Sequence, residues 1–162
     1  MASVKLAFGT ATAFTITLNS LASSGTAGRE STVVDNSTNL YVDALVEVRI
    51  NYPNSVPANE KAIYVYAYGS LDGTNYPEGL TGADAAYTFL GSAGALTTAL
   101  RLIGVIPANQ NTDKRYGPFP VAPAFGGLMP AKWGIAVLNY SGQTLAATNC
   151  AAQYREVYAT VA

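Results

Sequence analysis

The sequence predicts an all-β domain, an antiparallel β-sandwich of the jelly-roll type with about seven or eight strands and long connecting arms. Three observations carry this prediction. Apolar and polar residues alternate with a period of two along most of the chain, turn-forming clusters separate the alternating segments, and no segment has the 3.6-residue apolar stripe of a helix. The chain of 162 residues is long enough for one such domain, so we expect a single domain over 1–162.

Six segments show the alternation most clearly. In 12–18 the apolar residues Phe14, Ile16 and Leu18 share one face. In 39–50 six apolar residues alternate with more polar ones, as in an antiparallel strand with one buried face. The remaining expected strands are 62–68, 98–106, 132–140 and 153–161.

Three segments lie outside this strand pattern. Residues 1–12 form an extended N-terminal segment, 19–38 is rich in Ser, Thr, Ala and Gly, and 107–130 contains five prolines. Connections of this length are usually functional or disordered. Because they carry few charges, we expect 1–12, 19–38 and 107–130 to dock on a partner, the last two as docking loops.

The composition argues against several classes of function. The chain has no histidine, which removes the usual general base and the commonest metal ligand. Its net charge is −1 and its cations are scattered, so we expect no nucleic-acid partner. The single Cys150 cannot form an internal disulfide, and no apolar run reaches the length of a membrane span. We expect no enzyme, no cofactor, no bound metal and no membrane partner.

The acidic residues do not change this expectation. Asp43 and Glu47 would lie roughly 13 Å apart along one strand, which is too far for the carboxylate pair of a glycosidase. Asp72, Asn75 and Glu78 offer oxygen atoms in and after a turn, but without the spacing of an EF-hand. We interpret Ser70–Tyr76 as a structural turn in which Asp72 bonds nearby amides.

Tyrosine is abundant, with eleven in the chain. A tyrosine stripe on one strand is typical of a half-buried sheet face, of a subunit interface or of a platform for stacking sugar rings. Arginine and lysine in otherwise neutral connections are candidate anchors for a partner's carboxylates. The candidate partner-interface residues are Arg29, Glu30, Tyr64, Tyr66, Tyr68, Tyr76, Lys114 and Arg115.

Four stretches of the chain together resemble a known class of protein. They are Gly25–Ser31, Val34–Ala44, Tyr66–Tyr76 and Lys132–Gly142. They resemble small β-sandwich structural proteins of tailed bacteriophages and prophages, of the decoration or cement class. The resemblance implies a homo-oligomer, with a trimer favoured, that binds the major capsid protein of the same virion and stabilises the head shell at the capsid surface.

A second interpretation stays open, because the resemblance consists of strand and turn patterns without chemistry. The chain is alternatively a carbohydrate-binding, lectin-like domain, or a tail or fibre receptor-binding β-sandwich. In that case Tyr64, Tyr66, Tyr76 or Trp133 would serve as stacking platforms.

Overall fold

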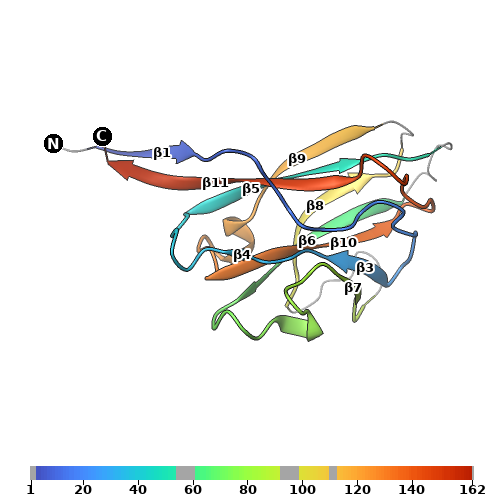
Figure 1. Ribbon diagram of the computed structural model, residues 1–162, viewed down its shortest axis with the longest axis horizontal. Coiled ribbons are helices and arrows are strands. Elements are labelled where there is room, and N and C mark those ends of the chain that lie inside the picture. The colour runs from blue at the N-terminus through green and yellow to red at the C-terminus, as the bar shows by residue number, and fades with distance from the viewer. Residues whose placement is uncertain (1–2, 54–60, 92–98, 110–112, 162) are drawn as a thin grey trace.

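The computed structural model describes residues 3–53, 61–91, 99–109 and 113–161. They form two antiparallel sheets packed face to face, so the predicted all-β sandwich is confirmed (Figure 1). The first sheet contains β1 (Val4–Phe8), β2 (Thr12–Ala13), β5 (Asp43–Ile50), β9 (Lys114–Pro120) and β11 (Ala151–Val161). The second contains β3 (Ala27–Glu30), β4 (Val34–Asp35), β6 (Ala62–Ser70), β7 (Ala85–Thr88), β8 (Arg101–Pro107) and β10 (Lys132–Tyr140).

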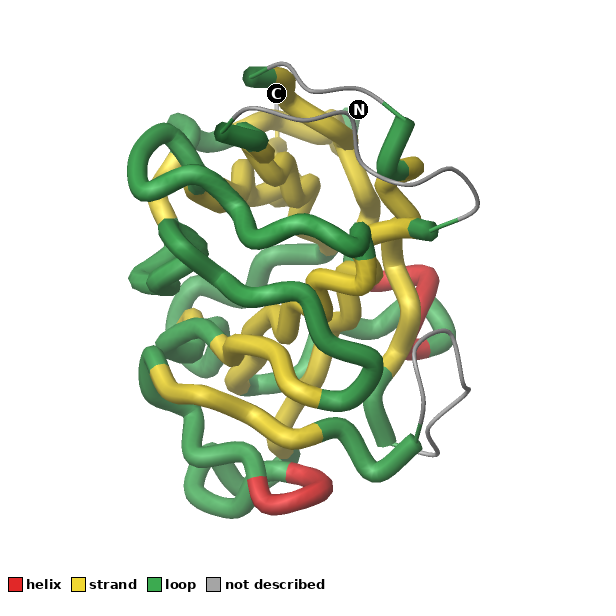
Figure 2. The backbone as a smooth tube through the Cα atoms, turned by 90° about the vertical axis from the view of Figure 1, so that its right-hand side faces the viewer, coloured by secondary structure: helices red, strands yellow, loops and turns green. Residues whose placement is uncertain are grey.

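The strand pairing is nested from the ends of the chain inward. β2 pairs with β11, β3 with β10, β5 with β9 and β6 with β8, all antiparallel. The chain is therefore one long antiparallel ribbon, which wraps until β11 also pairs with β5 and β10 with β6. This wrapped ribbon is the jelly-roll arrangement. The short 3-10 turns η1 (Pro77–Gly79) and η2 (Ala122–Phe125) are its helical elements in the described residues (Figure 2).

The main core lies between the two sheets. Along β5 every second residue is fully buried, as the alternation predicts. Trp133 of β10 lies at the centre of this core with no exposed surface. Its ring packs edge-on against Phe14, at 5.5 Å between ring centroids, and against Tyr154, at 5.4 Å.

A second apolar cluster covers the outer face of the second sheet. The chain after β6 folds back over this face, so that Tyr87 and Phe89 pack near Tyr66 and Tyr68. β10 and β6 are consequently buried on both faces. Gly134 makes room for the layer, because a Cβ atom there would lie 2.6 Å from the Tyr68 ring.

Several strand boundaries differ from the expectation. β5 begins at Asp43 rather than at residue 39, because Leu40 has a φ of 53° and turns the chain out of the sheet. Segment 19–38, expected as a docking loop, contains β3 and β4 and pairs within the second sheet. The proline-rich segment 107–130 contains β9, which lies at a sheet edge where prolines are tolerated.

One part of the first sheet extends past the sandwich. β1 pairs only with the last residues of β11, from Val4 opposite Val161 to Phe8 opposite Val157. The partner on the other side of β11, β5, ends its pairing at Val157. β1 and the end of β11 therefore project as a two-stranded ribbon, seen at the left of Figure 1, which we call the arm (residues 4–8 and 157–161).

Candidate functional site

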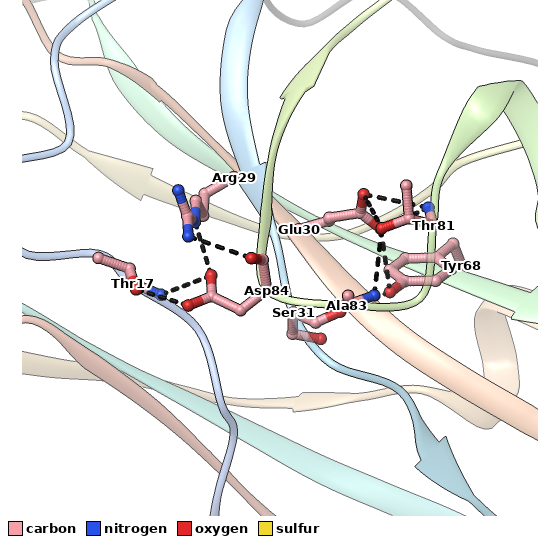
Figure 3. Close-up of polar contacts among 8 residues, drawn as sticks. All are labelled: Thr17, Arg29, Glu30, Ser31, Tyr68, Thr81, Ala83 and Asp84. Carbon is pink, nitrogen blue, oxygen red and sulfur yellow. Dashed lines mark hydrogen bonds and ion pairs between the residues drawn. The ribbon is translucent and has the colours of Figure 1, made fainter.

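Arg29 and Glu30, two of the predicted interface residues, make polar contacts within the domain on the two sides of β3 (Figure 3). The Glu30 side chain is buried, with only 1% of the residue exposed. Its carboxylate accepts hydrogen bonds from the Thr81 amide at 3.0 Å, the Thr81 hydroxyl at 2.9 Å and the Gly82 amide at 3.1 Å. These bonds hold the chain that covers the second sheet against β3.

Arg29 points to the other side of β3, where it binds Asp84. Its Nε donates to the Asp84 carboxylate at 2.6 Å, and the amide and hydroxyl of Thr17 donate to the same carboxylate at 3.0 and 2.5 Å. Burial by itself would raise the pKa of Asp84, but the bonds from Arg29 and Thr17 outweigh it and lower the pKa to about 2. The Asp84 carboxylate therefore connects three segments of the chain, its own, that of Arg29 and that of Thr17.

The predicted tyrosines are also engaged within the domain. Tyr66 and Tyr68 are buried, and Tyr68 donates its hydroxyl proton to the Ser31 carbonyl at 2.7 Å. Burial, followed by the charge of Glu30, raises the pKa of Tyr68. Tyr64 and Tyr76 are partly buried against Tyr66 and Tyr68 respectively. These tyrosines are covered because the chain after β6 packs over the outer face of the second sheet. The alternation of residues in the sequence does not reveal this layer.

Burial also affects the second interpretation, in which aromatic rings stack on sugars. Tyr66 and Trp133 have at most 2% of their surface exposed, so neither ring is available for stacking from solvent. Lys114 and Arg115 remain on the surface, on the edge strand β9. Arg115 forms an ion pair with Glu47 at 2.6 Å.

The acidic residues of the loops have separate protein partners. Asp72 accepts bonds from its own turn: the Asn75 side chain donates to it at 2.7 Å, and the amides of Asn75 and Thr74 donate at 2.8 Å. These bonds, that of the Asn75 side chain first, lower the pKa of Asp72. Glu78 accepts a bond from the Tyr87 hydroxyl at 3.0 Å. In the described part of the chain no three His, Cys, Asp or Glu residues form a group suited to a metal ion.

The arm carries a stripe of exposed apolar side chains on one face of its two strands. Val4, Leu6 and Phe8 lie on one face of β1 and are 72%, 65% and 54% exposed, and Val161 opposite Val4 is 76% exposed. The Arg155 guanidinium lies over the Phe8 ring, 5.7 Å from its centroid. Paired apolar side chains left in water on one face are typical of a contact surface.

The other face of the arm meets the body of the domain at a hollow of about 540 Å³. Its lining includes Tyr41, Tyr158 and Glu156, and the two tyrosine rings lie 6.3 Å apart. Burial, and then the charge of Glu156, raise the pKa of Tyr41. The loop before β5 is held in place beside the hollow, because the Tyr41 amide donates to the Asn36 side chain at 2.7 Å.

Comparison with protein-family models, with curated proteins and with solved structures finds no match for this chain. Within the described residues, no helix has the length and apolar character needed to cross a membrane. The sequence signal for the arm is the alternation of Val4, Leu6 and Phe8 within the expected contact segment 1–12, and the hollow has no comparable signal.

Proposed function

We propose that this chain is a structural protein of a virion, a decoration or cement protein that binds the capsid surface as an oligomer. The observation that carries this proposal is the arm, with its outward stripe of Val4, Leu6, Phe8 and Val161. Burying such side chains on a partner contributes roughly 25 cal/mol for each Å² of apolar surface removed from water. The partner we propose is the major capsid protein of the same virion.

The composition of the chain supports the same role. Charged residues make up 12% of the sequence, and the ion pairs Arg29–Asp84 and Arg49–Asp113 are satisfied within the domain. A largely neutral surface loses little hydration free energy when a neighbour covers it. The resemblance to phage decoration proteins adds the expected location, the outside of the head shell.

Shell binding tests the proposal directly. We expect the purified protein to cosediment with shells assembled from the major capsid protein of the same virion, and to raise their disruption temperature. The variant Leu6→Ser/Phe8→Ser should weaken binding at least about tenfold, because it removes apolar surface from the arm. The matched control is Leu71→Ser, which removes a leucine that is 96% exposed in the turn after β6 and should bind like the wild type. Failure of the wild type to cosediment, or an unaffected arm variant, would contradict the proposal.

One observation favours the second candidate, a carbohydrate-binding or receptor-binding domain. The hollow beside the arm combines the rings of Tyr41 and Tyr158 with the side chain of Glu156. Aromatic rings stack on sugars, and a carboxylate accepts from sugar hydroxyls. Binding to a glycan array that is lost in Tyr158→Ala, together with no affinity for shells, would favour this candidate over the first.

A further inference from the structure

The four edges of the two sheets are protected to very different degrees. The edge strand β9 contains Pro118 and Pro120, which cannot donate to a neighbouring strand. β7 has only four residues, and β8 has a register shift against β6. β1 has neither proline nor bulge, and in the described part of the chain it pairs on one side only. Lys5 is the one feature of β1 that discourages pairing, so β1 is the most open of the four edges and a template for a further strand.

The backbone groups that point outward from β1 follow from its pairing with β11. The Gly9 amide donates to the Glu156 carbonyl at 2.9 Å, so Gly9 faces β11. Because the hydrogen-bonding direction alternates along an antiparallel strand, Ala7 and Lys5 also face β11. The amide and carbonyl groups of Val4, Leu6 and Phe8 therefore point away from β11, toward the open edge.

This open edge is complementary to a second copy of itself. An antiparallel register with Leu6 opposite Leu6 of the other copy places Val4 opposite Phe8, so every outward-pointing backbone group meets another. The apolar side chains then form cross-strand pairs on one face. Lys5, the one charged residue of β1, lies opposite Ala7, whereas a register centred on Lys5 would oppose two like charges.

We infer that two copies of this chain associate by pairing their β1 strands antiparallel about Leu6. The pair forms a four-stranded ribbon in the order β11, β1, β1, β11, with the apolar stripes of both arms on a single continuous face. The inference rests on the proposed function, because that joined face is the surface offered to the shell. This dimer differs from the trimer implied by the resemblance, because pairing two identical strands antiparallel produces two-fold symmetry.

Removal of one amide tests the edge. Leu6→Pro deletes an outward N–H and leaves the bonds between β1 and β11 in place. We expect sedimentation equilibrium of the full chain to show a reversible dimer, and Leu6→Pro to weaken dimerisation at least about tenfold. Leu6→Val, which keeps the amide and an apolar side chain, should stay close to the wild type. Thermal unfolding of each variant checks that the domain is folded.

A charge exchange tests the register. Ala7→Lys places a lysine opposite Lys5 of the other copy and should weaken the dimer, while Lys5→Glu/Ala7→Lys places opposite charges there and should restore it. This pair of variants tests the inference even where Leu6→Pro fails to fold. A monomer at all concentrations, a trimer, or a dimer insensitive to these changes would overturn the inference.

The shell assay separates this inference from the proposed function. A wild-type protein that stays monomeric and still cosediments with shells would overturn the β1 pairing, and with it the oligomer, but would leave the proposed binding to the shell in place. A β1-paired dimer that ignores shells would overturn the proposed function and leave the pairing intact.

Discussion

Two regions of this molecule reverse the usual distribution of polar and apolar residues. At β3 the carboxylate of Glu30 is enclosed by protein, while on the arm Leu6 is 65% exposed. Glu30 is supplied with three hydrogen bonds from Thr81 and Gly82, so its burial is compensated within the chain. Leu6 has no such compensation, because among the described residues no layer covers the outer face of the two-stranded ribbon.

The difference teaches where to look for a partner. Arg29 and Glu30, a charged pair in a neutral segment, are among the eight residues that the sequence predicts at an interface, yet both bind their own domain. The arm uses ordinary strand residues, but its position beyond the sandwich leaves them uncovered. The candidate contact region is therefore identified by apolar side chains left exposed to water, and not by an unusual type of residue.

The largest expected effect comes from breaking the buried side of this comparison. Glu30→Ala removes the carboxylate that accepts from the Thr81 hydroxyl and from the amides of Thr81 and Gly82, and the loss of these charge-assisted bonds should lower the free energy of unfolding by about 3 kcal/mol. Glu30→Gln keeps one acceptor oxygen and should cost less. Denaturant unfolding measures both, and a loss below about 1 kcal/mol in Glu30→Ala would contradict the structural role of the cluster.

An intermediate effect is expected at Asp84, with a defined pH dependence. The pKa of Asp84 falls from its ordinary value of 3.8 to about 2 on folding, so the folded state binds fewer protons between these values. The resulting stabilisation, about 2 kcal/mol, is complete above pH 5 and is lost as the pH falls through 3.8 toward 2. The difference in unfolding free energy between the wild type and Asp84→Asn should follow this curve. A difference that stays constant from pH 7 to pH 2 would show that Asp84 does not titrate this way.

The smallest effect on stability is expected on the arm. Leu6→Ser replaces a side chain that is mostly exposed already, so the free energy of unfolding should change by no more than about 0.5 kcal/mol. The same change should weaken shell binding, which separates a contact residue from a structural one. A loss of stability comparable to that of Glu30→Ala would show that Leu6 packs within its own domain.

The sequence predicted the central strands well, because their alternation is strict. Residues 132–140 form β10 with those bounds, and 153–161 lies within β11. Prediction failed where other interactions compete with the pattern. The segment 12–18 keeps its alternating burial, but only Thr12 and Ala13 pair as a strand. β9 was hidden among prolines, which an edge strand accepts.

The candidate site could be predicted only in part. Segment 1–12 was expected to contact a partner, and it contains β1 of the arm. The projection of the arm depends on the length of β11, whose pairing with β1 continues beyond the end of β5. That difference in length is a property of the paired strands together, and neither strand shows it alone.

The sequence by itself determined the class of fold, because a period of two in apolar residues fixes which side of each strand is buried. It also determined the absence of histidine and the near-neutral charge. Only the tertiary structure decided which side chains are covered by another segment, as Tyr66 and Tyr68 are, and which are left in water, as Val4 and Leu6 are. The reason is that alternation specifies an apolar face, whereas its cover depends on where distant segments pack.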